Sequence, residues 1–218
     1  MPTHLPPESW ILEGVMTTLA PAPAGSPTHA GLNIAPMGPI VDRRFEQFVF
    51  RPFATSTTYR NLKATGAGVF HVTDDVLLIA RAAMGTVTAV SDVAIEPAQH
   101  VRGFVLADAC RYYELQVRAL DDRNERTRIE AKVVSSESRR DFFGFNRARH
   151  AVLEAAILVT RLFLTGPGPV LAELDRLQVI VDKTGSDPEH TAMSELRSHV
   201  ERAADAAKYL SAEATKVD

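Results

Sequence analysis

The sequence predicts an α+β protein, mainly β, in which a small barrel carries attached helices. Three observations support this prediction. Strand-like segments rich in β-branched and aromatic residues recur through the first two thirds of the chain. They do not alternate regularly with helices, as a doubly wound sheet would require. From residue 146 onward the apolar residues follow helical spacing. We therefore expect a β-rich body at residues 1–144 and a helical region at 145–218.

Seven segments are expected to be strands, at residues 10–19, 29–34, 46–53, 68–72, 103–108, 109–120 and 127–136. The patch of Pro, Ala and Gly at residues 21–27 predicts a loop after the first of them. In the strand at 109–120, alternation predicts one buried face and one wet face, the wet one carrying Tyr112, Glu114, Gln116 and Arg118.

Two helices are expected within the β-rich body. The first covers residues 57–65 and stops at Gly66; the second follows Asp74 and Asp75 and stops at Gly85. Three helices are expected after residue 146, separated by the breaker TGPGP and by Gly185. The last begins with the capping-box pattern Ser186-Asp187-Pro188-Glu189.

Composition restricts the class of protein. The charged share of 23% and the net charge of −3 lack the basic excess of a nucleic-acid binder, so no nucleic-acid partner is expected. No apolar run reaches the length of a membrane span, and no secretory signal is recognisable at the N-terminus, so no membrane partner is expected. The single Cys110 excludes an internal disulfide and a CxxC site, and we expect a cytoplasmic protein.

The most informative stretch is RPFATSTTYRNLKATG, at residues 51–66. It places an arginine and four consecutive hydroxyl residues at the start of a predicted helix. The free N–H groups and the dipole of a helix N-terminus attract an anion, and hydroxyls add donors. One N-cap needs only one hydroxyl, although a cap alone remains the alternative. The pattern indicates a phosphate site formed by Arg51, Thr55, Ser56, Thr57 and Thr58.

Four blocks in this order resemble the DUF447 family. They are NIAPMG (33–38), RPFATSTTYRNL (51–62), TG-GVFHVTDD (65–75) and FNRARHAVLEA (145–155). The resemblance covers nearly the whole chain. The members are flavoproteins related to the FMN-binding split barrels of the flavin reductase-like group. One departure is His71, where the family pattern suggests asparagine.

The resemblance implies a homodimeric split β-barrel that binds FMN near the subunit interface. Its phosphate would lie at the hydroxyl-rich loop, with Asn61 one turn further along the helix. The isoalloxazine ring would lie along the segment of Asn33, Ala35, Pro36, Met37 and Gly38. Asn146, Arg147 and Arg149 open the first C-terminal helix and form a second potential anion site, because arginine near a helix N-terminus favours a neutralising partner.

Other groups of residues favour structural roles. The histidines show no HxH, HxxxH or HExxH spacing, so no metal site is expected. Cys110 reads as a small buried hydrophobe, with a nucleophile as the alternative. Asp74 and Asp75 read as helix-capping residues rather than as a catalytic carboxylate pair.

The function that these features imply is an FMN-dependent oxidoreductase in which the flavin carries the redox chemistry. No side chain is therefore assigned a catalytic role. The partner of the flavin would be a nicotinamide, a deazaflavin or a pterin substrate. The alternatives are a flavin-binding or regulatory dimer without turnover, and a barrel that binds no flavin and serves as an interaction module.

Overall fold

A computed structural model describes residues 8–22, 29–87 and 93–214, and the side chains among them up to residue 206. The chain divides into two compact units. One consists of residues 1–74 and 87–142, and the other of residues 75–86 and 143–218. The predicted loop at 21–27 lies mostly outside the described residues.

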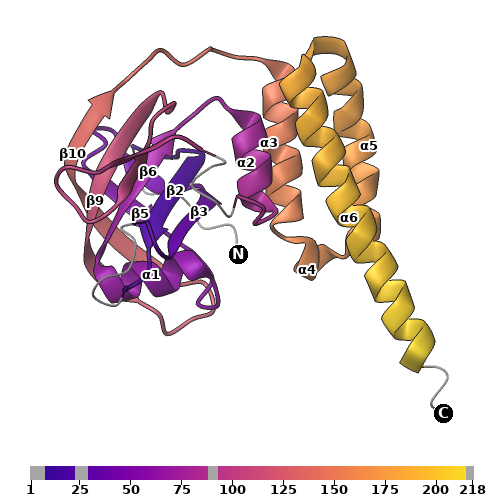
Figure 1. Cartoon of the computed structure of the whole chain (residues 1–218), viewed down its shortest axis with the longest axis horizontal. Coiled ribbons are helices and arrows are strands. Elements are labelled where there is room, and N and C mark those ends of the chain that lie inside the picture. Colours follow the sequence, from indigo (N-terminus) through magenta and orange to yellow (C-terminus); the bar gives the residue numbers. More distant parts are fainter. Residues whose placement is uncertain (1–7, 23–28, 88–92, 215–218) are drawn as a thin grey trace. The chain divides into compact units, whose positions relative to one another are not determined.

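The first unit is built on a curled antiparallel sheet of eight strands in the order β1-β4-β5-β10-β9-β6-β2-β3 (Figure 1). The strands are β1 (Ser9–Ile11), β2 (Gly14–Leu19), β3 (Leu32–Met37), β4 (Ile40–Asp42), β5 (Gln47–Phe50), β6 (Ala67–Val72), β9 (Arg111–Asp121) and β10 (Arg128–Ser138). A separate hairpin pairs β7 (Ile95–Pro97) with β8 (Phe104–Leu106).

The predicted first strand is two strands in the structure. β1 pairs with β4, whereas β2 pairs with β3 and β6. The change of partner falls next to Gly14, where an added Cβ would collide with the carbonyl oxygen of His71. β4 itself was not predicted, because three residues are too short to show a period.

The second predicted strand begins and ends later than expected. β3 covers Leu32–Met37, so Ala35, Pro36 and Met37, which follow the predicted end of the strand at residue 34, are strand residues. β3 is the last strand of the sheet. An edge strand tolerates Pro36 because the missing N–H removes no ladder hydrogen bond on its open side.

The helix α1 (Thr57–Thr65) has the predicted limits and ends at Gly66, which has the left-handed φ of 68°. It lies across one end of the curled sheet (Figure 1). Its buried residues Tyr59 and Leu62 join a core cluster with Met16, Phe48 and Phe70. At about 25 cal/mol per Å² of apolar area removed from water, this burial holds the helix in place more strongly than its cap does.

The predicted wet face of the strand at 109–120 is wrong in its first half. Tyr112 and Glu114 are buried, as are Tyr113 and Leu115. The reason is the β7–β8 hairpin, which packs Val101 and Val105 against Val69 and Tyr112.

Glu114 is fully buried and accepts hydrogen bonds from three backbone N–H groups of the β7–β8 turn. Its donors are the N–H groups of Gln99, His100 and Val101, at 3.2, 2.6 and 2.9 Å. A buried carboxylate is tolerated only where donors compensate for its lost hydration. Glu114 therefore fastens the hairpin to the sheet.

His71 also fastens the hairpin. Its Nε2 accepts from the N–H of Leu106 at 3.0 Å, so its Nδ1 carries the proton and donates to the carbonyl of Val15 at 3.1 Å. The ring is fully buried and both nitrogens are used. His71, whose role the sequence left open, therefore has a structural role.

The second unit is a group of packed helices. It contains α2 (Val76–Ala83), α3 (Arg147–Val159), the one-turn α4 (Leu162–Thr165), α5 (Pro167–Thr184) and α6 (Asp187–Ala214). α3, α5 and α6 lie side by side, and α2 packs against α3 and α6 (Figure 1). Met193, Leu196 and Val200 of α6 are fully buried, as the helical spacing of the apolar residues in this region predicts. Ala203 follows the same spacing and is half-buried, whereas Ala207 and Leu210 lie outside the described side chains.

Among the described residues, no helix combines the length and the apolarity needed to cross a membrane.

We predict that acid destabilises the fold through His71. Burial lowers the pKa of its ring from 6.5 to about 3. Between those values the unfolded chain binds a proton that the folded protein does not. This contribution to stability is therefore complete above pH 6.5 and falls as the pH decreases toward 3, by up to ~1.4 kcal/mol per pH unit.

The measurement is urea unfolding at a series of pH values. His71→Gln keeps one donor and one acceptor but does not titrate, so its free energy of unfolding should fall less steeply below pH 6.5 than that of the wild type. His150→Gln is the matched control, because His150 is exposed. If the free energy of unfolding decreased equally steeply with falling pH in the wild type and in His71→Gln, the prediction would be contradicted.

Candidate functional site

The loop between β5 and α1 is held firmly against the start of β10. The N–H of Ala54 donates to the carbonyl of Glu125 at 2.9 Å, and Phe53 forms an isolated bridge with Arg126. Thr127 donates to the carbonyl of Pro52 through both its N–H and its hydroxyl, at 3.0 and 2.9 Å. The backbone that leads to the hydroxyl residues is therefore held in place by its hydrogen bonds to residues 125–127.

The hydroxyls at the start of α1 act as acceptors toward the protein. Ser56 is the N-cap, and its Oγ accepts from the N–H of Tyr59 at 3.2 Å. The hydroxyl of Thr57 accepts from the Arg60 guanidinium at 2.9 Å, and that of Thr58 accepts from the Asn33 amide at 3.1 Å. Among the described residues, none of these three hydroxyls donates a hydrogen bond. The protons of the half-buried Ser56 hydroxyl and of the exposed Thr57 hydroxyl are therefore left for an acceptor from outside, whereas the Thr58 hydroxyl is buried.

Sequence reasoning missed Arg60. Its guanidinium donates to the carbonyl of Thr55 at 2.6 Å as well as to Thr57, so it holds the loop against the first turn of the helix. The signal was present, because an arginine three residues after Thr57 lies on the same face of a helix. It places a cation beside the Thr57 hydroxyl.

A buried polar cluster lies behind this first turn. The hydroxyl of Thr18, in β2, accepts from the Asn33 amide of β3 at 3.2 Å and from the Asn61 amide of α1 at 3.1 Å. Thr58 joins it through Asn33. We refer to Thr18, Asn33, Thr58 and Asn61 as the amide cluster. Thr18 was not predicted to belong to the site.

The predicted phosphate-site residues differ in exposure. Thr55 and Thr57 are exposed, whereas Arg51 and Ser56 are half-buried. Thr58 and Asn61 are buried, with relative exposures of 3% and 4%, and belong to the amide cluster. The exposed hydroxyls therefore form the outer layer, and Thr58 and Asn61 form the layer that supports it.

The residues predicted to lie along a flavin ring follow β3 toward the same helix. Asn33, Ala35, Pro36, Met37 and Gly38 are all half-buried. Of these, Asn33 contacts α1 through Thr58. Gly38 is confined, since a Cβ there would lie 2.6 Å from a carboxylate oxygen of Glu13.

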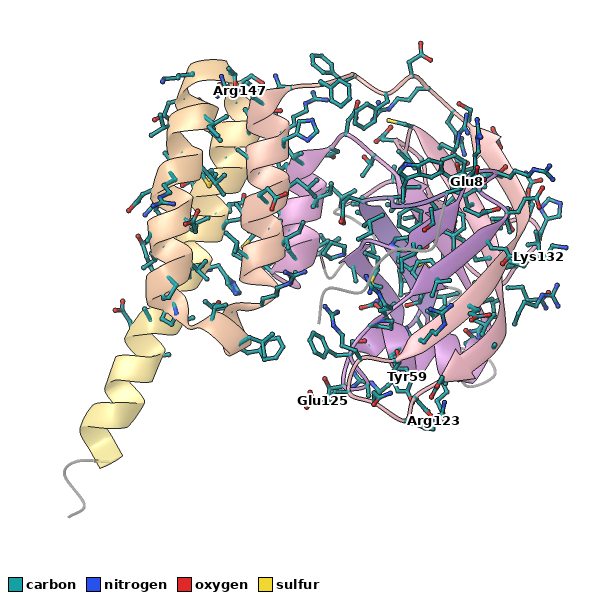
Figure 2. The ribbon with its side chains drawn as sticks, turned by 180° about the vertical axis from the view of Figure 1, so that it is seen from behind. Glu8, Tyr59, Arg123, Glu125, Lys132 and Arg147 are labelled. Atoms are coloured by element: carbon teal, nitrogen blue, oxygen red, sulfur yellow. The ribbon has the colours of Figure 1, made fainter. Side chains whose placement is uncertain are left out.

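Asn146 and Arg147 belong to the helical unit. Asn146 is the N-cap of α3: its Oδ1 accepts from the N–H of Arg149 at 3.0 Å, and its Nδ2 donates to the carbonyl of Thr184 at 3.2 Å. Arg147 is exposed in the first turn (Figure 2). Their membership of a site with the α1 residues stays a prediction.

The far end of α1 is clamped to the β9–β10 hairpin. The Asp122 carboxylate accepts from the Tyr59 hydroxyl and from the Lys63 ammonium, both at 2.7 Å. Figure 2 shows Tyr59 close to Arg123 and Glu125 of the same hairpin. The hydrogen bond from Lys63 lowers the pKa of Asp122. This clamp fixes the direction of the helix and hence of its N-terminus.

The remaining candidates have structural roles. Asp75 is the N-cap of α2 and accepts from the N–H of Leu78 at 3.0 Å, as expected. Asp74 is paired with Arg140 at 2.6 Å. Cys110 is buried, and burial raises the pKa of its thiol, which disfavours a nucleophilic thiolate. Among the described residues, no group of three or more His, Cys, Asp or Glu side chains is placed to hold a metal ion.

Comparison with solved structures shows which class of fold this chain has. The structure is similar to the crystal structure of an FMN-bound DUF447 protein from Methanosarcina mazei, with a TM-score of 0.72 and 21% identity over 87% of this chain and 94% of that one. Together with the curled antiparallel sheet, this likeness confirms the predicted split-barrel fold.

The chain belongs to the DUF447 family, whose members are described as proteins of unknown function. Residues 24–140 match the model of its N-terminal domain and residues 146–198 that of its C-terminal domain. The resemblance inferred from four sequence blocks is therefore confirmed. No curated protein matches the chain.

Two other solved structures are less similar to this chain. One is the flavin reductase HpaC complexed with NADP+, with a TM-score of 0.48 and 15% identity over 62% of this chain and 82% of that one. Another is an FMN-binding protein from Thermus thermophilus with bound 1-cyclohex-2-enone, with a TM-score of 0.46 and 12% identity over 64% of this chain and 76% of that one.

Proposed function

We propose that this protein is an FMN-binding flavoprotein that acts as an oxidoreductase. The observation that carries the proposal is the set of hydroxyls at the start of α1 whose oxygens already accept hydrogen bonds within the protein. It occurs in a chain of the DUF447 family, and the family member from Methanosarcina mazei is FMN-bound.

The donor set fits a phosphate monoester. Such a group carries roughly −1.5 to −2 charge near neutral pH and offers only acceptors at its ionised oxygens. The exposed hydroxyls of Thr55 and Thr57, the Ser56 hydroxyl and the open N–H groups of the helix all donate. Arg51 and Arg60 supply positive charge at the same loop. Thr58 and Asn61 would support these groups from within.

The ring of the flavin would lie along β3. Asn33, Ala35, Pro36, Met37 and Gly38 form a half-buried strand edge that leads away from α1. A flat ring needs backbone that approaches closely, and Pro36 and Gly38 provide little side-chain bulk there. Within the helical unit, Asn146 and Arg147 of α3 would form a second anion-binding group of their own.

Bound FMN would supply the hydride and electron transfer. The residues of this chain would bind the phosphate, orient the ring and exclude water from one face. Cys110 and His71 are buried and engaged, and Asp74 is paired with Arg140, so the proposal assigns none of these side chains to proton transfer. The electron partner would be a nicotinamide, with a deazaflavin or a pterin substrate as the alternatives to test.

We predict that the purified protein binds FMN at micromolar concentration and that the bound flavin is reduced by a nicotinamide cofactor. FMN binding is measured by the change in flavin fluorescence, and reduction of the bound flavin is measured by the loss of nicotinamide absorbance. Binding without turnover by any nicotinamide, deazaflavin or pterin donor would instead indicate a flavin carrier or regulator. Failure to bind FMN would contradict the proposal. It would instead favour the alternative that the barrel binds no flavin and serves as an interaction module.

We predict that Arg51→Ala weakens FMN binding at least tenfold but riboflavin binding by less than threefold, because only FMN has the phosphate. A charge-assisted hydrogen bond contributes about 1.5–3 kcal/mol, which is roughly 10- to 100-fold in affinity. The measurement is fluorescence titration of both flavins.

Lys132→Ala is the matched control for this prediction. It also removes one positive charge, but from an exposed site on β10 away from Tyr59 and α1 (Figure 2). Equal losses for FMN and riboflavin in Arg51→Ala would remove Arg51 from the phosphate site.

We also propose that the protein is a homodimer with the flavin near the subunit interface. Among the described residues β1 and β3 are the outermost strands of the sheet, and on β1 the side chains of Trp10 and Ile11 are about half exposed, at 50% and 45%. Unpaired strand edges with apolar side chains favour association. Sedimentation equilibrium should give twice the mass of 23.8 kDa. Trp10→Glu should shift it toward the monomer, whereas an unchanged dimer would place the interface elsewhere.

A further inference from the structure

Thr18 is the least exposed member of the amide cluster, with a relative exposure of 1%. It lies in β2 directly opposite Asn33 of β3. Its single hydroxyl oxygen has two lone pairs, and both are used, by Asn33 Nδ2 at 3.2 Å and by Asn61 Nδ2 at 3.1 Å. One buried oxygen therefore sets the direction of two carboxamides.

The contacts of Asn33 determine which end of its amide is available. Its Nδ2 has two protons, one donated to Thr18 and the other to Thr58. Its donor capacity is therefore exhausted inside the protein. Its Oδ1 accepts no hydrogen bond from the described residues and is not a buried atom. The atom of the Asn33 side chain that remains available to a ligand is therefore its acceptor oxygen, Oδ1.

An outward acceptor does not suit a phosphate oxygen, which also accepts. It suits a hydrogen-bond donor, and a flavin has donors of two kinds, the ribityl hydroxyls and the N3–H of the ring. Asn33 lies between the phosphate-binding turn of α1 and the half-buried edge of β3, where these parts of a flavin would follow the phosphate.

We propose that Thr18 is a positioning residue that turns the Asn33 carboxamide so that its oxygen accepts a hydrogen bond from a ribityl hydroxyl or from N3–H of the flavin. The proposal rests on the proposed flavin site. Asn33 touches the ligand, and Thr18 acts only through Asn33. Without the Thr18 hydroxyl, an amide proton of Asn33 loses its acceptor, and the amide turns to present its nitrogen.

The test compares dissociation constants of FMN, riboflavin and lumiflavin for the wild type and for three variants. Thr18→Val keeps the shape of the side chain but removes the hydroxyl, and should weaken FMN and riboflavin by about tenfold each, because one hydrogen bond is lost from a part that both share. Thr18→Ser keeps the hydroxyl and should bind within threefold of the wild type.

Thr17→Val is the matched control. Thr17 is the neighbouring residue of β2 and is also fully buried, and its hydroxyl donates to the carbonyl of Phe104 at 2.6 Å. The same substitution there removes a buried hydrogen bond that has no link to Asn33. It should lower stability and leave flavin affinity unchanged. A merely structural effect of Thr18→Val would be matched by Thr17→Val.

Lumiflavin separates the two donors, because it has N3–H but no ribityl chain. If Thr18→Val weakens lumiflavin as well, N3–H is the donor; if lumiflavin is unaffected while riboflavin is weakened, the donor is a ribityl hydroxyl. Either result supports the proposal. It is overturned if Thr18→Val binds riboflavin as the wild type does, or if Thr18→Ser is as weak as Thr18→Val.

A second measurement needs no variant and applies if Thr18→Val does not fold. The side-chain amide resonances of Asn33 in the wild-type protein should shift on addition of riboflavin and remain unshifted on addition of inorganic phosphate. Shifts with phosphate alone would overturn the proposal. Failure of the wild type to bind any of the flavins would instead overturn the proposed function, so the two failures are distinguishable.

Discussion

The hydrogen bonds of the Thr18 hydroxyl connect the three elements on which the candidate site is built. β2 supplies the acceptor, and β3 and α1 supply the amides that donate to it. Because Thr18, Thr58 and Asn61 are buried, each of their polar groups would cost about 1–3 kcal/mol if left unpaired. The position of α1 on the sheet is therefore specified by polar contacts as well as by the packing of Tyr59 and Leu62. Every other feature of the site depends on that position.

Two further restraints keep the first turn of α1 in place. The clamp of Tyr59, Lys63 and Asp122 holds the helix to the β9–β10 hairpin, and Arg60 holds the preceding loop to the helix. The hydroxyls of Ser56 and Thr57 are thus already oriented as acceptors toward the protein. A ligand that binds them would not have to order the loop, which reduces the entropic cost of binding.

On the face of the sheet opposite α1, a second set of buried polar contacts holds the β7–β8 hairpin. There the β7–β8 hairpin is fastened by three buried polar side chains from neighbouring strands, Thr17, His71 and Glu114. Their positions explain why Tyr112 and Glu114 are buried where the alternating pattern predicts a wet face. A strand pattern reports which residues are polar, but a buried carboxylate with several N–H donors cannot be distinguished from an exposed one by sequence alone.

Features that depend on neighbouring residues were predictable from the sequence: the limits of α1, the cap of α2 at Asp75, the helical spacing of apolar residues in the C-terminal region and the family. The choice of Ser56 as the cap of α1 was not predicted. Helix caps and the helical spacing of apolar residues depend on residues close together in the sequence, so both can be predicted from the sequence. The tertiary structure alone decided the division of residues 10–19 into β1 and β2, the burial of Glu114, and the meeting of Thr18, Asn33 and Asn61. These depend on contacts between residues distant in sequence, which form only when the sheet closes and brings one oxygen within reach of two amides.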